Sequence, residues 1–323
     1  MRPIWIGIIS SFFFAFTFVL NRSMELAGGS WMWSAALRFF FMLPPLLFLV
    51  FLRGNLGMLW IEIKKHPKEW ILWSTVGFGL FYAPFCFAQS YGPGWLIAGT
   101  WQITIISGSL LAPFFFEQKT GSQGVQLVRG KISLPGLWMS SIILLGIVFM
   151  QSEQASVLQP KEVLLGFLPV VVASFAYPLG NRKMMQICGE RVDTYQRVLG
   201  MTICSMPFWM LLSITALVVD GAPSQSQVFQ TSLVAIFSGI CATVLFFRAT
   251  EMVKGNMRRL AAVEATQSME VLFATAGEVV WLSASLPTPV ASTGLLLIML
   301  GMILHSLVSG RKEKETPPFH VSD

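Results

Sequence analysis

Residues 3–22 read PIWIGIISSFFFAFTFVLNR, an uncharged and largely apolar run that ends at Asn21 and Arg22. A helix needs about 20 predominantly apolar residues, within a range of about 17 to 25, to cross the hydrocarbon core of a bilayer. The run has no small-residue cleavage site of the kind that follows a secretory signal, and further apolar runs come after it. It predicts a first membrane-spanning helix that the protein retains.

The same kind of run recurs along the whole chain. Hydrophobic residues make up 54% of the 323 residues and charged residues only 12%, whereas soluble domains carry about a quarter charged residues. The sequence therefore predicts an all-α integral membrane protein with ten transmembrane helices. The expected spans are 3–21, 31–52, 70–88, 95–116, 135–151, 163–180, 198–219, 231–250, 260–282 and 287–309.

Basic residues predict how these spans are oriented. With a cytoplasmic N-terminus, Arg22 and Lys161 are the only Lys or Arg residues in outer loops, and Arg38 and Arg248 lie within spans. All other Lys and Arg residues fall in inner segments, as the positive-inside rule requires. This bias favours ten spans with both termini cytoplasmic. Because the basic residues lie in these inner segments, we attribute the net charge of +6 to orientation in the membrane and not to nucleic-acid binding.

The two halves of the chain resemble each other. AFTFVLNR at 15–22 aligns with FAYPLGNR at 175–182, and at a nearly equal offset Gly94 aligns with Gly255 and Glu117 with Glu278. Five spans per half is an odd number, so the second copy has the opposite topology, as in many secondary transporters. We therefore expect a first five-helix repeat at 1–155, an inverted repeat at 156–309 and a disordered cytoplasmic tail at 310–323.

Several short motifs accompany this repeat. Gly92-Pro93-Gly94 precedes the fourth span, Glu117 and Glu278 end spans four and nine, and the stretches AGTWQITI and AAVEATQSME lie at 98–105 and 261–270. Together with the ten spans, these motifs resemble the drug/metabolite transporter superfamily. The two stretches are similar to the ten-helix bacterial branch of multidrug resistance efflux transporters. The resemblance implies a central cavity walled mainly by spans 1, 3, 4, 6, 8 and 9, which opens alternately to each side.

Acidic residues form a stripe along the ninth span. At 100° per residue, Glu264, Gln267, Glu270 and Glu278 fall within one arc of about 120°. Ionisable side chains inside a membrane are costly and mark functional pathways. We expect Glu270, the nearest to mid-bilayer, to carry a proton or to balance a cationic substrate, with Glu264 and Gln267 on the same pathway. Alternatively Glu270 pairs with Arg38 of the second span, which either neutralises an intramembrane acid or binds substrate.

Neutral residues complete the expected pathway. Trp101 offers an aromatic face that can hold a cation, and Gln102 offers an amide. Polar positions match on spans one and six, and the third span carries a tyrosine; these residues are Thr17, Asn21, Tyr82, Tyr177 and Asn181. Small hydroxyl residues at helical spacing are common in helix packing, so Thr100, Thr104 and Ser107 are interpreted first as packing residues.

The sequence predicts a transporter rather than an enzyme. It contains no phosphate-binding Walker loop and no HExxH, and its four cysteines form no metal-binding pattern, so no cofactor or metal is expected. Our leading hypothesis is a proton-coupled antiporter in the cell membrane, acting as monomer or homodimer, that exports lipophilic or cationic drugs. The first alternative is an exporter or facilitator of an endogenous metabolite such as an amino acid. Remote alternatives are a membrane scaffold or sensor, and an intramembrane enzyme acting on lipid.

Overall fold

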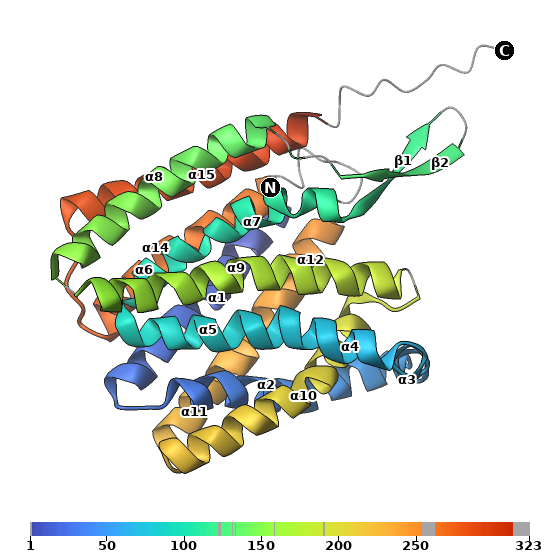
Figure 1. Cartoon of the computed structure of the whole chain (residues 1–323), viewed down its shortest axis with the longest axis horizontal. Helices are drawn as coiled ribbons and strands as arrows, with labels where there is room; N and C mark the ends of the chain where they lie inside the picture. Colours follow the sequence, from blue (N-terminus) through green and yellow to red (C-terminus); the bar gives the residue numbers. More distant parts are fainter. Residues whose placement is uncertain are drawn as a thin grey trace.

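The computed structural model describes residues 2–121, 124–130, 132, 134–157, 159–189, 191–253 and 262–312, and this part of the chain is mostly helical (Figure 1). Long helices are α1 (Arg2–Leu26), α2 (Trp31–Leu52), α8 (Leu134–Val157), α9 (Pro160–Cys188), α10 (Thr194–Val219) and α15 (Pro289–Lys312). Two further long segments are composite. The first joins α4 (Pro67–Ser74), the π-helix η1 (Thr75–Gly79), α5 (Leu80–Ala88) and the 3₁₀ turn η2 (Gln89–Tyr91), and the second joins α11 (Gln225–Val234), the π-helix η4 (Ala235–Ala242) and α12 (Thr243–Glu251).

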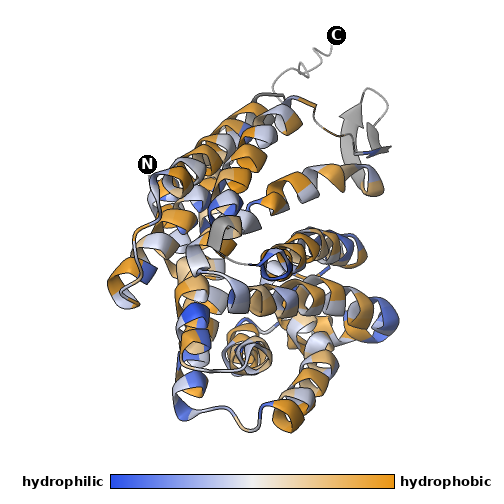
Figure 2. Cartoon of the chain, turned by 60° about the vertical axis from the view of Figure 1, so that its left-hand side comes forward, coloured by the Kyte–Doolittle hydropathy of each residue, from blue (hydrophilic) through white to orange (hydrophobic). Residues whose placement is uncertain are grey.

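Eight helical segments in the described part of the chain are long and apolar enough to cross a membrane. They coincide with eight of the ten predicted spans. Most of their residues are hydrophobic (Figure 2), and large apolar side chains on them are exposed, among them Phe48 at 62% and Trp138 at 73%. In a bilayer this surface contacts lipid, which explains how a chain so rich in apolar residues avoids burying all of them.

The other two predicted spans are broken helices instead of continuous ones. The segment predicted at 95–116 forms α6 (Gly94–Trp101) and α7 (Ile103–Leu110), which meet at Gln102. The Gln102 side chain donates to the Ala98 carbonyl at 3.0 Å, and such bonds compete with regular helical pairing. The segment predicted at 260–282 contains the 3₁₀ turn η5 (Ala265–Ser268) and α14 (Met269–Trp281), and hydroxyls of Thr266 and Ser268 bond carbonyls three residues earlier.

The prediction of an all-α protein missed one short hairpin. After α7 and the 3₁₀ turn η3 (Ala112–Phe114), β1 (Phe116–Gly121) pairs antiparallel with β2 (Gly124–Arg129). Val125-Gln126-Leu127 has the apolar–polar alternation of a strand, a signal that the sequence analysis did not use. The fourth span therefore ends earlier than predicted. The hairpin and the short helix α3 (Leu56–Lys65) lie at the same end of the molecule (Figure 1).

Helices from the two halves of the chain pack against each other. Helix α1 contacts α14, η4 and α12, while α2 packs on α10 and α5 on α9. Helices α8 and α15 lie side by side (Figure 1). Their close approach depends on Gly146 and Gly294, because a Cβ at Gly146 would lie 2.5 Å from the Gly294 carbonyl oxygen. Small residues at such contacts let helix backbones approach closely.

Candidate functional site

A cavity of about 560 Å³ lies between the helices of both halves. This volume falls in the usual range for sites that bind small molecules, about 300 to 1,000 Å³. All of the predicted pathway residues except Asn21 line it. They are Thr17, Arg38, Tyr82, Trp101, Gln102, Tyr177, Asn181, Glu264, Gln267 and Glu270.

Arg38 is held in the cavity wall by hydroxyl groups. Its Nη2 donates to Ser238 Oγ at 3.2 Å and its Nη1 to Thr17 Oγ1 at 3.4 Å, and Thr17 in turn donates to Ser238 at 2.5 Å. The guanidinium carbon lies 4.2 Å from the centre of the Tyr82 ring, a cation–π contact that partly offsets the loss of hydration. The Arg38 side chain is only 9% exposed.

Glu270 lines the same cavity from α14 and is 8% exposed. Among the described residues, none donates a hydrogen bond to its carboxylate, and no Lys, Arg or His nitrogen lies within the 4.0 Å of an ion pair. The alternative hypothesis of a direct Glu270–Arg38 pair therefore does not describe this conformation. Arg38 and Glu270 both line the cavity, each from its own helix.

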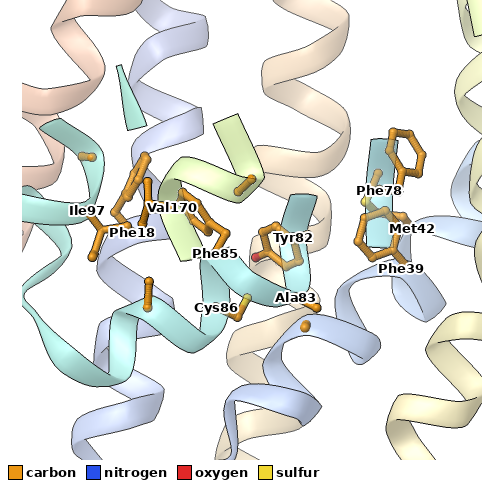
Figure 3. Close-up of a cluster of buried hydrophobic side chains, with 14 of the residues drawn as sticks. Phe18, Phe39, Met42, Phe78, Tyr82, Ala83, Phe85, Cys86, Ile97 and Val170 are labelled. Atoms are coloured by element: carbon orange, nitrogen blue, oxygen red, sulfur yellow. The ribbon is translucent and has the colours of Figure 1, made fainter. Parts of the chain in front are cut away.

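Asn21 lies behind the cavity wall, where it positions other side chains. Its Nδ2 donates to the Tyr82 hydroxyl oxygen at 3.0 Å and to Cys86 Sγ at 3.5 Å. Figure 3 shows Tyr82, Phe85 and Cys86 on one helix, with Tyr82 facing Phe39 of α2. Asn21 is thus not among the residues that line the cavity, but it contacts Tyr82, which is.

Aromatic side chains form one wall of the cavity. Phe81, Phe85, Trp101 and Tyr177 contact each other with ring centroids 4.8 to 5.7 Å apart for the pairs Phe81–Trp101, Phe81–Tyr177, Phe85–Trp101 and Trp101–Tyr177. Tyr177 is nevertheless 39% exposed. The prediction singled out Trp101 and Tyr177; the two phenylalanines from α5 were not recognised, because a phenylalanine on an apolar helix carries no distinguishing sequence signal.

The remaining predicted residues differ in their local contacts. Glu264 is exposed within the described structure, and Gln267 donates to Ser11 Oγ at 3.1 Å. Asn181 donates to the Tyr177 carbonyl of its own helix at 2.9 Å. The hydroxyls of Thr104 and Ser107 bond Ser174 of α9, as expected for packing residues.

Glu278 has a structural position outside the cavity lining. Its carboxylate accepts hydrogen bonds from the backbone N–H groups of Gly94 at 2.6 Å and Trp95 at 3.1 Å. It therefore caps the N-terminus of α6, where the helix dipole favours a negative charge. The repeat counterpart Glu117 has a side chain outside the described residues.

Several polar residues that line the cavity were not predicted to do so, among them Ser238, Arg182 and Arg197. Ser238 lies in η4, where a π-helical turn rotates residues away from the face that 100° per residue assigns to them. Arg182 and Arg197 stand at helix ends and were assigned to orientation. Arg182 donates to the Gly108 carbonyl at 2.6 Å, so its side chain also joins α9 to α7.

The lining residues nearest to helix ends all come from one end of the bundle. Gly108 lies in the last turn of α7, Asn181 in the C-terminal part of α9 and Phe247 in the last turns of α12. Arg197 lies in the first turn of α10. Polar contacts join the helices at the other end. Gln227 donates to the Ser30 carbonyl at 2.7 Å and to Ser34 Oγ at 2.9 Å, and Arg22 donates to the Gln89 carbonyl at 3.1 Å.

Comparison with known proteins identifies the family. Residues 1–311 match the EmrE family, described as "Putative multidrug resistance efflux transporter". The chain belongs to this family. Membership makes it a multi-pass membrane protein of the drug/metabolite transporter superfamily, a group of transporters.

Two relatives of this EmrE-family chain come from Bacillus subtilis (strain 168) and Shouchella clausii. It is 54% identical over 316 residues to "Uncharacterized protein YjlA" of Bacillus subtilis (strain 168), covering 98% of each chain. It is 46% identical over 271 residues to "Uncharacterized 42.1 kDa protein in intracellular alkaline protease 3'region" of Shouchella clausii, covering 84% of this chain and 70% of that protein. A crystal structure that is 14% identical superposes with a TM-score of 0.61 over 98% of this chain and 99% of its own, which shows a shared fold.

Proposed function

We propose that this chain is a secondary active transporter that exports small amphipathic molecules from the cytoplasm by alternating access, coupled to protons through Glu270. The observation that carries the proposal is a cavity of about 560 Å³ whose lining combines an aromatic wall with the Glu270 carboxylate, which accepts no hydrogen bond from the described residues. An intramembrane acid without a fixed partner is suited to exchanging a proton for a substrate. A scaffold or sensor would not need such a cavity.

The proposed architecture is ten spans in two inverted repeats, with 1–155 and 156–309 as the repeats. It is supported by matching irregularities. The π-helices η1 and η4 begin 160 residues apart, at Thr75 and Ala235, and the two broken spans are the fourth and the ninth. π-Helical turns are rare and often lie at functional sites, so their recurrence favours a shared ancestral unit over coincidence.

The proposed orientation places both termini in the cytoplasm and the chain in the cell membrane. The cavity then extends from mid-membrane toward the cytoplasmic side, where the basic segments lie, and the polar contacts of Gln227 and Arg22 close the outer side. This arrangement corresponds to an inward-facing state that receives substrate from the cytoplasm. A single chain provides the entire cavity, so a monomer suffices, although a homodimer is compatible.

Proteoliposomes with an imposed pH gradient and a fluorescent lipophilic cation test this proposal. Dye movement should require the gradient and should be lost in Glu270→Gln. Other titratable or charged groups that line the cavity are Arg38, Tyr82, Tyr177, Arg182, Arg197, Glu264 and His305. The matched control is therefore Glu69→Gln, on an exposed helix start away from them. Equal, gradient-dependent transport by Glu270→Gln and wild type would refute proton coupling at Glu270.

An amino-acid or metabolite exporter is the second candidate. The observation that favours it is the charge of the cavity, which holds Arg38, Arg182 and Arg197 against Glu264 and Glu270. A site built only for lipophilic cations has no use for this excess of positive charge. Arg38 is the residue that decides between the two candidates.

A further inference from the structure

Arg38 carries more hydrogen-bond donors than the described residues around it accept. A guanidinium carries five N–H groups, and Arg38 uses one nitrogen on Ser238 and another on Thr17, both neutral acceptors. Its Nε is buried and makes no hydrogen bond within the described residues. The residue is therefore only partly satisfied by the protein around it.

A countercharge for Arg38 is missing from its immediate surroundings. In the described part of the chain, no Asp or Glu oxygen lies within 4.0 Å of the guanidinium. A charged side chain at this depth is costly, and such residues usually pair with an opposite charge or face a water-filled pathway. Arg38 lines the cavity, so an anionic group of a bound molecule can reach it.

The rest of the cavity defines what that molecule must carry. Glu270 stands on a different helix from Arg38 and has no hydrogen-bond donor among the described residues, so it can receive a cationic group. In the lining of the same cavity, Phe81, Trp101 and Tyr177 supply an aromatic surface. The site thus combines separate positive and negative groups with an apolar wall.

We propose that Arg38 binds the carboxylate of a zwitterionic substrate, an α-amino acid with an aromatic or large apolar side chain, whose ammonium group faces Glu270. Thr17 and Ser238 position the guanidinium for this contact. The inference rests on the proposed transport function and names its substrate class. Arginine suits this role better than lysine because its planar fork matches the two oxygens of a carboxylate.

The test measures binding of three probes to the full-length protein reconstituted in lipid. L-phenylalanine carries both charges, L-phenylalaninamide lacks the carboxylate, and a fluorescent lipophilic cation has neither the carboxylate nor the amine. The variants are Arg38→Gln and the control Arg53→Gln, whose side chain pairs with Asp193 on the surface. Dye and amino-acid transport are followed in the same vesicles.

The expected result is selective for the carboxylate. Arg38→Gln should weaken phenylalanine binding about 10- to 100-fold, the loss expected for a hydrogen bond to a charged group. Binding of phenylalaninamide should change by less than about twofold on the same reasoning. Arg53→Gln should change neither.

Misfolding is separated from loss of the site by a second variant. Arg38→Lys keeps the charge but not the fork, so it should fold and show a smaller loss for phenylalanine only. Ser238→Ala removes one hydroxyl that orients Arg38 and should also weaken phenylalanine binding alone. A monodisperse size-exclusion profile establishes folding for each variant.

Three outcomes overturn the inference. If Arg38→Gln binds phenylalanine as well as wild type does, Arg38 is not the carboxylate site. If wild type moves the lipophilic cation but does not bind phenylalanine, the transport proposal stands and the substrate class is wrong. If wild type transports neither the lipophilic cation nor phenylalanine under any gradient, both the transport proposal and this inference fail.

Discussion

Glu278 and Glu270 lie on the same helix, and the structure predicts opposite consequences of neutralising them. The Glu278 carboxylate is 1% exposed and accepts hydrogen bonds from the backbone N–H groups of Gly94 and Trp95. The Glu270 carboxylate lines the cavity and accepts no such bond from the part of the chain that the structure describes. We therefore expect Glu278 to stabilise the fold and Glu270 to serve transport.

The expected loss of unfolding free energy follows from the two hydrogen bonds that Glu278 accepts. A hydrogen bond to a charged group contributes about 1.5 to 3 kcal/mol, so deleting both in Glu278→Ala removes at most about 6 kcal/mol. Hydrogen bonds between helices contribute less than this to stability when they are measured in membranes, because the polar groups of the unfolded chain also find hydrogen-bond partners there. We expect about 3 kcal/mol for Glu278→Ala, and about half of that for Glu278→Gln, which keeps a carbonyl acceptor.

Unfolding of the purified protein in mixed micelles with increasing SDS measures this difference. Glu278→Ala should unfold at a lower SDS fraction than wild type. Glu270→Gln should unfold at the same or a higher fraction, because it removes a poorly solvated charge without breaking a bond. Transport by surviving Glu278→Gln protein should still depend on the pH gradient, whereas transport by Glu270→Gln should not.

A different order of stability among the Glu278 and Glu270 variants would refute the reasoning. If Glu270→Gln is the less stable variant, its carboxylate holds the fold together and the cavity geometry described above is not the functional one. If Glu278→Ala is as stable as wild type, the carboxylate does not cap α6. If Glu278→Gln abolishes coupling while remaining folded, the proton pathway includes the outer end of α14.

Three further predictions follow from packing, aromatic contacts and accessibility. Gly146→Ala should lose about 1 to 3 kcal/mol by overpacking, whereas Gly57→Ala, with nothing within 4 Å of the new Cβ, should not; SDS unfolding compares the two. Trp101→Ala should weaken binding of an aromatic probe about fivefold or more through the lost ring contacts, and Trp138→Ala on the outer face should leave it unchanged in the same titration. In a cysteine-free background, Asn181→Cys should react with an impermeant maleimide from the cytoplasmic side, and substrate should slow the reaction; labelling only from outside would reverse the proposed orientation.

Much of the fold could be predicted because lipid imposes a simple length rule. Eight of the ten expected spans are continuous segments of sufficient length and apolarity. The two exceptions are interrupted at Gln102 and by the 3₁₀ turn at Ala265–Ser268. A hydropathy window averages over about 19 residues, so it locates both segments but does not detect a break within them. Side-chain bonds to carbonyls of the same helix do not mark the breaks either, because Thr202 and Thr293 make such bonds in continuous helices.

The candidate site was predictable where a polar residue interrupts an apolar run. Arg38 and Glu270 stood out for this reason, and both line the cavity. Ser238 did not, because the π-helix around it shifts the helical phase. The direct pairing of Arg38 with Glu270 was a reasonable alternative from charge alone, yet only three-dimensional placement shows that hydroxyl groups take the place of the carboxylate.

The contacts of Arg38 also link substrate binding to the motion proposed for transport. Arg38 and Thr17 belong to the first half of the chain, and Ser238 and Glu270 to the second. The bond from Arg38 to Ser238 therefore crosses the interface along which two repeats would rock. A carboxylate on Arg38 would use the donors that Ser238 and Thr17 leave free, and an ammonium group of the same molecule on Glu270 would connect it to the second half. Binding would thus change which state is favoured, because a ligand shifts a conformational equilibrium only by its differential affinity for the two states.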